Sequence, residues 1–264
     1  GHPVTIRFLD PPLHEFVPRT EEKKAEVAKE LGVTVEEIEK RGESLHEVNP
    51  MMGHRGVRLH VSFPLIAEVE YRAIFTAAAE LQEEGLHPVP EIMIPVTISA
   101  RELSFQKAIC NRVKAEVEGM YSTTINYQFG TMIEIPRAAL TGDRMARTAQ
   151  FFSFGTNDLT QMTFGFSRDD VGTFMGEYLG NKILDADPFK TIDTKGVGKL
   201  VEYGIQSGRS KRPDLKCGVC GEHGGDPDSI KFFNKIGIDY VSCSPFRVPI
   251  ARLAAAQAAI EQSK

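Results

Sequence analysis

A thiol, two carboxylates and an amide stand where three apolar segments of this chain end. Cys220 closes a short apolar run that begins at Lys216, and a glycine-rich turn follows it. Glu134 lies in a second apolar run, and Asn157 and Asp158 directly follow a third. An unpaired carboxylate in or beside a buried strand is costly, so these positions indicate either structural ion pairs or a functional site. Because Mg²⁺ takes one or two carboxylates together with substrate oxygens, we predict a Mg²⁺ site held by Glu134 and Asp158.

Two arginines could supply the positive charge that a phosphate needs. Arg7 lies in the middle of an apolar run, and Arg55 lies between glycines just before another. The guanidinium fork matches phosphate oxygens in pairs, so the two side chains could clamp a phosphate. Arg7 could instead be paired with Asp10, and Arg55 could be a solvated loop charge. Gly155 and Thr156 could add backbone donors to an anion, which is a weaker signal.

Cys217 and Cys220 have the spacing of a redox pair or of half a zinc site. No second Cys/His pair has metal-binding spacing, since Cys110 and Cys243 are isolated. A redox pair usually opens a helix, whereas strand alternation here would point the two thiols to opposite faces. We therefore interpret Cys220 as a lone acid/base thiol, with zinc or dithiol chemistry as the alternative. His223 could tune or orient this thiol, or only cap the turn.

The composition bounds the class of protein. The chain has 264 residues, of which 41% are hydrophobic, which suffices for the core of an α/β barrel. With 31 basic and 36 acidic residues the formal net charge is −5, so nothing in the overall charge favours nucleic acid or an anionic membrane as a partner. No segment approaches the ~18 apolar residues of a spanning helix, and the N-terminus does not read as a signal peptide. Four cysteines in a chain of this length are not a disulfide framework, so we expect a reducing cytoplasm or organelle interior.

Short apolar runs alternate with helical patterns along the chain. Seven runs are predicted to be buried parallel strands: Val4–Leu9, Gly56–Val61, Glu91–Val96, Gly130–Ile135, Phe151–Gly155, Cys217–Gly221 and Tyr240–Ser244. Helices are predicted at Ile66–Glu83, Ala100–Glu118, Asp228–Ile236 and Val248–Gln262, and as a small pair at Glu21–Leu31 and Thr34–His46. Repeated β-α units of this kind predict a parallel sheet with helices outside it.

The distribution of the chemistry favours one architecture. A doubly wound sheet would concentrate its site at one switch point, whereas here candidate residues recur at the carboxyl ends of nearly all strands. We therefore predict a TIM-type (β/α)8 barrel that lacks its first β-α unit, as one domain over residues 1–264. A helical insertion at 11–50 and a Gly-, Asp- and Phe-rich stretch at Met162–Pro188 interrupt the rhythm, and such long loops are usually lids, interfaces or binding loops.

Several strings resemble a known family. The run Phe151–Gln161, FFSFGTNDLTQ, is similar to the phosphoenolpyruvate-utilising barrels, and Cys220–Pro227 resembles the catalytic cysteine turn of that family. The run Asp10–Phe16 and the insertion after it resemble the pyruvate, phosphate dikinase branch in particular. The resemblance covers essentially the whole chain.

The resemblance implies a role for each matching position. Glu134 and Asp158 match magnesium ligands, Cys220 matches the general acid/base, and the substrate-binding positions are Arg7, Arg55, Gly155, Thr156, Asn157 and Asp158. The implied activity is the interconversion of pyruvate and phosphoenolpyruvate (PEP), with the phosphoryl group carried by a phosphohistidine on a separate swivelling domain. The family also implies a homodimer, and we expect its contact at Met162–Pro188. A synthase-like barrel and a non-catalytic substrate-binding or dimerising fragment remain as alternatives.

Overall fold

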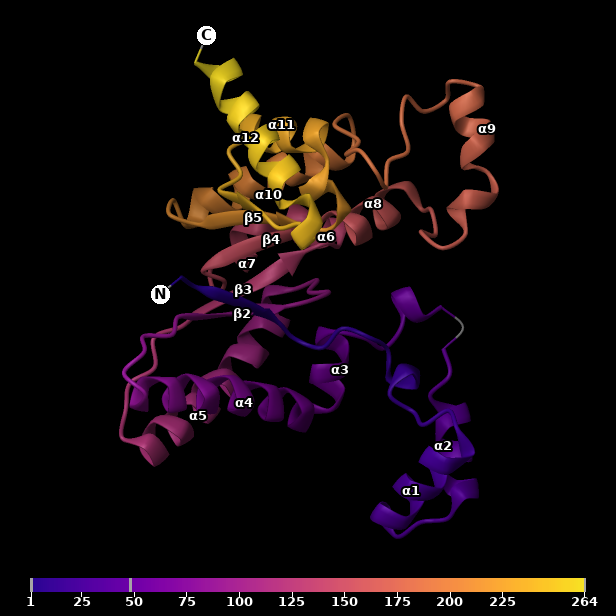
Figure 1. Cartoon of the computed structure of the whole chain (residues 1–264), viewed down its shortest axis with the longest axis vertical. Helices are drawn as coiled ribbons and strands as arrows, with labels where there is room; N and C mark the ends of the chain where they lie inside the picture. Colours follow the sequence, from indigo (N-terminus) through magenta and orange to yellow (C-terminus); the bar gives the residue numbers. More distant parts are fainter. Residues whose placement is uncertain (1, 48, 264) are drawn as a thin grey trace.

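The fold is built on one sheet of six parallel strands that lie side by side in chain order (Figure 1). The computed structural model describes residues 2–47 and 49–263; residues 1, 48 and 264 of the predicted domain, the second also in the predicted insertion, lie outside the described residues. The strands are β1 (Val4–Arg7), β2 (Pro90–Ile94), β3 (Gln128–Ile133), β4 (Phe151–Gly155), β5 (Lys216–Cys220) and β6 (Tyr240–Val241). Strand order that follows chain order is the arrangement of a barrel, and here the curled sheet is open between β6 and β1.

Helices lie above and below the strands in the view of Figure 1. On one side lie α4 (Pro64–Glu83) and α5 (Ala100–Tyr121); on the other lie α10 (Val197–Lys211), α11 (Pro227–Lys235) and α12 (Val248–Gln262). Shorter elements connect them: η1 (Leu13–Glu15), η2 (Pro50–Met52), α6 (Pro136–Leu140), α7 (Gly142–Met145), η4 (Glu222–Gly225) and η5 (Pro245–Arg247). Among the helices of the described part, none is both long enough and apolar enough to cross a membrane.

Alternation along the strands divides the buried side chains between two faces. Phe152 and Cys217 point outward into the main core beneath the helices. Phe151 and Cys220 belong to a second, inner cluster together with Met132. The two cysteines of the Cys-x-x-Cys string therefore face opposite sides of β5, as strand alternation predicts.

An ion pair crosses the inner face near the amino ends of the strands. Glu91 of β2 is buried and pairs with Lys216 of β5, although β3 and β4 lie between these strands. The hydroxyl of Thr5 on β1 also donates to the Glu91 carboxylate, over 2.8 Å. The Lys216 ammonium lies over the rings of Phe151 and Tyr240, with its nitrogen 5.5 and 5.4 Å from the two centroids. The Glu91 carboxylate therefore links β1, β2 and β5 on the inner face of the sheet.

The predicted strand Gly56–Val61 is wrong, because this segment forms the helix α3 (Val57–Ser62). Gly56 has a φ of 53° and turns the chain into the helix, and Pro64 begins α4 two residues after α3 ends. Val57, Leu59 and His60 are buried, a spacing that a short helix and a short strand can both give. The described residues therefore contribute six strands and not seven, and a closed eight-stranded barrel would need two further strands instead of one.

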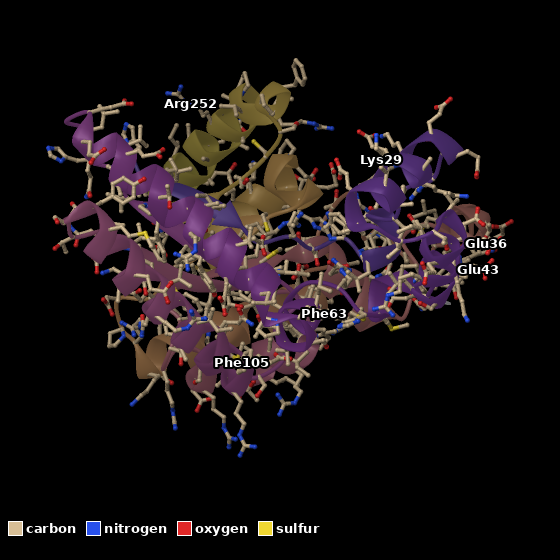
Figure 2. All side chains as sticks on the ribbon, turned by 90° about the horizontal axis from the view of Figure 1, so that it is seen from below. Lys29, Glu36, Glu43, Phe63, Phe105 and Arg252 are labelled. Atoms are coloured by element: carbon tan, nitrogen blue, oxygen red, sulfur yellow. The ribbon has the colours of Figure 1, made fainter. Side chains whose placement is uncertain are left out.

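The predicted helical pair exists as α1 (Glu21–Leu31) and α2 (Val35–Ser44). Thr34 and Glu37 form a capping box at the start of α2. The helical pair stands away from the sheet, and Figure 2 shows Lys29, Glu36 and Glu43 on it. Ser99 and Glu102 form a second capping box, at the start of α5.

A second excursion follows α8 (Thr156–Phe164) and holds η3 (Val171–Thr173) and α9 (Met175–Gly180). Val171, Met175 and Phe189 give it a small apolar cluster of its own. In Figure 1 this excursion and the α1–α2 pair both project on the side toward which the strands run. The two insertions therefore flank the carboxyl ends of the strands, where a barrel carries its site.

Candidate active site

One cavity of about 460 Å³ lies at the carboxyl ends of the strands. It is lined by Arg7, Asp10, Met51, Arg55, Met93, Met132, Glu134, Gly155, Asn157, Asp158, Arg168, Cys220 and Gly221. Every predicted site residue except Thr156 is in this set. The cavity is thus lined by residues of β1, β2, β3, β4, β5 and α8 and by Arg55, which lies just before α3.

Glu134 directly follows β3 and is 1% exposed. The backbone N–H of Val96 donates to its carboxylate over 2.6 Å. Burial, followed by the charges of Asp158 and Asp10, raises the pKa of Glu134 to about 8. A carboxyl in this state is nearly neutral at physiological pH and gains from any cation that enters beside it.

The two arginines occupy different environments. Arg55 is buried, and its Nε donates to Oδ1 of Asp10 over 2.9 Å while Nη2 pairs with Oδ2. The same Nη2 lies 3.3 Å from Oδ2 of Asp158. Burial lowers the pKa of Arg55, but the bond to Asp10 and the surrounding carboxylates outweigh it, so that its pKa is raised overall.

Arg7 also approaches Asp10, with Nη1 3.6 Å from Oδ2, so the pairing considered as the alternative for Arg7 is present. Its side chain nevertheless remains 49% exposed. A guanidinium in that position keeps most of its donors free for an incoming anion. Arg55 is thus held in place by the protein, whereas Arg7 is available at the mouth of the cavity.

Glu134 and Asp158 are the two carboxylates of the cavity that could share a metal ion. In the part of the chain that the structure describes, no group of three or more His, Cys, Asp and Glu side chains could hold a metal ion by itself. Mg²⁺ often uses only one or two protein carboxylates and keeps waters or substrate oxygens for its other positions. Burial and, after it, the charges of Asp158 and Asp10 raise the pKa of Glu134, and a divalent cation beside the carboxylates would offset both effects. The pair therefore fits Mg²⁺ held jointly with a ligand and does not fit a site closed by protein alone.

Cys220 ends β5 with its thiol toward the cavity. The hydroxyl of Ser153 donates to Sγ over 3.3 Å, and Sγ lies 3.8 Å from the carbonyl oxygen of Phe154. Burial raises the pKa of Cys220 to about 11 in spite of the Ser153 bond, so the thiol is a proton donor at neutral pH. Burial in the outer core raises the pKa of Cys217 to about 12. Two thiols on opposite faces of a strand are not placed to act as a dithiol.

The remaining predicted residues divide by what they contact. Gly155 lies against Glu134, and a Cβ added there would come within 2.8 Å of the glutamate Cβ, so the close approach requires glycine. Oδ1 of Asn157 accepts from the N–H of Glu222 over 3.3 Å and so ties α8 to the turn after Cys220. Thr156 is fully buried, and its hydroxyl contacts His223 and the carbonyl of Cys220, so its side chain is outside the cavity lining.

Sequence reasoning missed several lining residues. Asp10 was considered only as a partner for Arg7, although it follows a strand end much as Asp158 does and holds Arg55 in the structure. Arg168 comes from the excursion after α8, and its Nη2 lies 3.7 Å from Oε1 of Glu222. No local pattern marks Arg168 in the sequence. Met93 and Met132 line the floor and were assigned only to strands.

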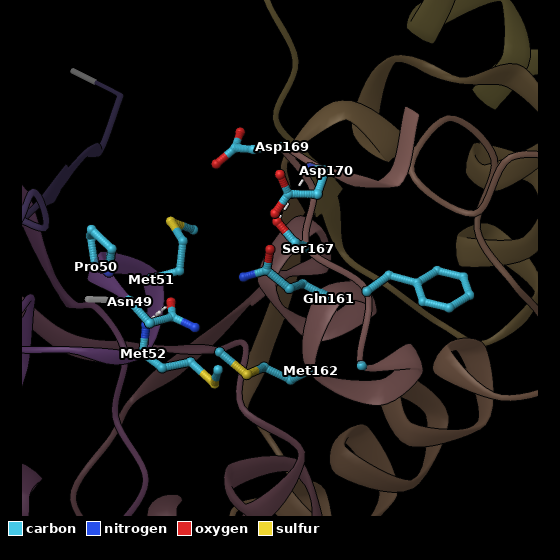
Figure 3. A pocket seen from close by; sticks show the side chains of 11 residues that line it. Asn49, Pro50, Met51, Met52, Gln161, Met162, Ser167, Asp169 and Asp170 are labelled. Atoms are coloured by element: carbon cyan, nitrogen blue, oxygen red, sulfur yellow. Dashed lines mark hydrogen bonds between the residues drawn. The ribbon is translucent and has the colours of Figure 1, made fainter. Parts of the chain in front are cut away.

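A second cavity of about 440 Å³ adjoins the first and shares Met51 with it. Figure 3 shows Met51 and Met52 on one side of this space and Gln161, Met162 and Asp170 on the other. None of its described lining residues is a cation, whereas the first cavity has three arginines. An anionic substrate is therefore expected in the first cavity.

Comparison with known proteins agrees with this geometry. The family described as "PEP-utilising enzyme, PEP-binding domain" matches residues 1–260. The chain is 59% identical over 261 residues to pyruvate, phosphate dikinase of Clostridium symbiosum. The aligned part is 98% of this chain and 30% of that protein. It is 55% identical over 262 residues to the chloroplastic pyruvate, phosphate dikinase 1 of Arabidopsis thaliana (98% of the chain, 27% of that protein), and 55% identical over 261 residues to the dikinase of Rhizobium meliloti strain 1021 (98% and 29%). The chain spans less than a third of the length of these relatives.

Proposed function

The chain belongs to the PEP-utilising enzymes as their PEP-binding domain, and from this premise we propose that it interconverts pyruvate and PEP. The phosphoryl group would come from, or go to, a phosphohistidine on a swivelling domain elsewhere in a longer chain. The whole enzyme would then convert ATP, phosphate and pyruvate into AMP, diphosphate and PEP. The observation that carries the proposal is the single cavity that unites Arg7, Glu134, Asn157, Asp158 and Cys220.

The arginines would bind the phosphoryl group. In the forward direction the enolate oxygen of pyruvate forms a bond to phosphorus as the bond from phosphorus to the histidine nitrogen breaks. Negative charge on the peripheral phosphoryl oxygens is then stabilised by nearby guanidinium groups. Arg7, with free donors at the cavity mouth, is suited to contact these oxygens, and Arg55 is held rigidly behind it by Asp10.

Glu134 and Asp158 would hold Mg²⁺. When bound there, the ion supplies positive charge beside the carboxylate and carbonyl oxygens of pyruvate and lowers the cost of enolate formation. Asn157 lies next to Asp158 at the start of α8 and could orient the substrate through its amide nitrogen, since its Oδ1 is engaged by Glu222. Gly155 leaves the space that the Glu134 side chain occupies, because a Cβ at this position would meet the glutamate.

Cys220 would move the proton at carbon. In the direction that consumes PEP, loss of the phosphoryl group leaves an enolate, and the Cys220 thiol gives its proton to the methylene carbon. A thiol whose pKa is about 11 is protonated before this step and regains a proton readily from water afterwards. The forward direction is the reverse of this step: the thiol first gives up its proton to water, which a pKa of about 11 makes infrequent at neutral pH, and the resulting thiolate then takes a proton from the methyl group of pyruvate.

The alternatives to this function are a synthase-like barrel and a non-catalytic fragment. A synthase-like barrel would use water in place of phosphate; the insertion that carries α1 and α2 and the identity of the relatives above both favour the dikinase. Dependence of turnover in the longer chain on phosphate or on water separates the two. A non-catalytic fragment that only binds substrate or dimerises is favoured by the open edges of the sheet.

We also propose a homodimer through the excursion that carries α9. Leu179 and Ile183 expose 37% and 62% of their surface there, although this segment has its own buried cluster. Apolar side chains on a projecting element gain by being covered in an assembly. Sedimentation of the wild type and of Leu179→Lys/Ile183→Lys tests this, and an unchanged dimer in the variant contradicts it.

Calorimetry with oxalate tests the proposed site, because oxalate presents two oxygens as the pyruvate enolate does. Mg²⁺ and oxalate should bind cooperatively to the wild type, and Glu134→Gln should remove the Mg²⁺-dependent binding. Glu118→Gln is the matched control, since the Glu118 carboxylate also accepts from a backbone N–H, that of Ile125 over 2.7 Å, but does not line the cavity. Unchanged binding in Glu134→Gln would show that the metal assignment is mistaken.

A further inference from the structure

His223 is buried in the turn after Cys220 but does not line the cavity. Its Nδ1 lies 2.7 Å from the hydroxyl oxygen of Thr156, and its Nε2 lies 2.8 Å from the carbonyl oxygen of Pro188. The same hydroxyl oxygen of Thr156 lies 3.2 Å from the carbonyl oxygen of Cys220. One imidazole therefore joins the last residue of β5, the first residue of α8 and the end of the excursion that carries α9.

The hydrogen-bond partners settle which ring nitrogen carries the proton. The carbonyl of Pro188 can only accept, so Nε2 must donate. Burial lowers the pKa of His223 against the opposing effects of the Pro188 bond and of Asp226, Glu222 and Asp187, so the ring is neutral. Nδ1 of a neutral ring protonated at Nε2 is an acceptor, and the hydroxyl of Thr156 must therefore donate to it.

The hydroxyl of Thr156 consequently has one proton and two acceptors, Nδ1 of His223 and the carbonyl oxygen of Cys220. Such a three-centre bond fixes the hydroxyl between them and holds the Cys220 carbonyl at the same time. The turn beyond it is constrained as well, since Gly221 has a φ of 103° and Glu222 donates its N–H to Asn157. The backbone of Cys220 is thereby fixed on the side away from the thiol.

We propose that His223 and Thr156 are positioning residues for the Cys220 thiol, and this inference rests on the proposed role of Cys220. Neither side chain reaches the reacting atoms. They set the position of the Cys220 backbone, and with it the contact of Sγ with Ser153 and the partial burial of the thiol. The link to Pro188 extends this control to the excursion, so that a displacement of the excursion's end is transmitted to the thiol through a single ring.

Alkylation of Cys220 by iodoacetamide, followed by peptide mass spectrometry, tests the proposal without any substrate. Thr156→Val removes the hydroxyl at nearly constant volume and should accelerate alkylation of Cys220 about fivefold, the equivalent of one neutral hydrogen bond. Thr156→Ser keeps the hydroxyl and should restore a rate close to that of the wild type. His223→Gln should accelerate alkylation to a similar extent. The double variant Thr156→Val/His223→Gln should match the single variants, because the two residues act through one contact.

Cys243 is the internal control, since it is a half-buried thiol of the same chain outside this network. An unchanged Cys220 rate in both single variants, multiplied effects in the double variant, or an equal acceleration at Cys243 would each overturn the proposal. If the positioning is confirmed but oxalate fails to bind the wild type with Mg²⁺, the proposed function fails while the positioning role stands. The two failures are therefore distinguishable.

Discussion

Glu134→Gln should make the chain more stable at alkaline pH while removing one of the two proposed Mg²⁺ ligands. The pKa of Glu134 is about 8 in the folded chain against an ordinary value of 4.5, because the carboxyl is buried beside Asp158 and Asp10. The folded state therefore binds a proton that the unfolded state has released throughout the interval between these values. By linkage the wild type is most stable below about pH 4.5 with respect to this group, and it loses that stability as the pH rises to about 8.

The size of the effect follows from the gap between the two pKa values. Each pH unit within the window corresponds to about 1.4 kcal/mol, so the wild type should lose roughly 4 kcal/mol of unfolding free energy by about pH 8 through this group. Glutamine has the same shape and cannot ionise, and its oxygen can still accept from the N–H of Val96. The variant should therefore escape most of this loss.

Urea unfolding of wild type and Glu134→Gln at several pH values across that window, with EDTA present, measures the difference. The two curves should nearly coincide near pH 4.5 and diverge as the pH rises, with the variant the more stable. Glu91→Gln should be less stable than the wild type, because it removes the charge that pairs with the Lys216 ammonium. A variant Glu134→Gln that is less stable than the wild type at about pH 8 would refute the reasoning from a carboxyl buried beside Asp158 and Asp10.

Three further outcomes are expected. Arg55→Met should lower the free energy of unfolding in urea by about 3 kcal/mol, because it leaves the buried Asp10 without its two contacts to Arg55. Arg7→Met, at a half-exposed position, should lower it by less than about 1 kcal/mol. Equal losses would contradict the division of roles between the two arginines. In a longer chain that carries this domain, Cys220→Ala should abolish net turnover and spare the exchange reaction of the nucleotide, which takes place in another domain. Cys217→Ala should reduce turnover only mildly, and equal loss in the two variants would restore the dithiol interpretation. Supplying two additional β-α units, in cis or as a separate chain, should raise both the melting temperature and the PEP affinity by pairing the open edges of β1 and β6; an unchanged melting temperature would argue that the open sheet is complete as it stands.

The parallel sheet could be predicted from the sequence, and so could many of the residues that line the cavity, because a strand end can be recognised both by the apolar run before it and by the polar residue that stops the run. Glu134 and Asp158 stand at the end of apolar runs, where a charge conflicts with burial and therefore indicates a function or a pair. The strand predicted at Gly56–Val61 failed because a run of six residues carries too little periodicity to separate a strand from a short helix. Gly56 has a positive φ that turns the chain into that helix, and this conformation could not be inferred from the residue type alone.

Side-chain orientation was the other limit. Thr156 follows the end of β4 as a site residue would, yet the structure turns its hydroxyl toward His223, because α8 begins at this residue. Asp10 was recognised as a partner for Arg7, but its paired contact with Arg55 joins positions 45 residues apart. Contacts of that separation depend on the packing of α3 against the sheet and leave no local pattern.

The ion pair between Glu91 and Lys216 has a geometric consequence for the site at the opposite end of the strands. It joins β2 to β5 across the inside of the curl, as a chord joins two points of an arc. In a flat sheet those strands would lie about 14 Å apart, and flattening would pull the buried pair open. The chord thus sets the radius of the curl where no barrel closure does. The distance from Arg7 on β1 to Cys220 on β5 is then constrained by two residues outside the cavity lining, and a change at either of them would be measured first as a change in the width of the cavity.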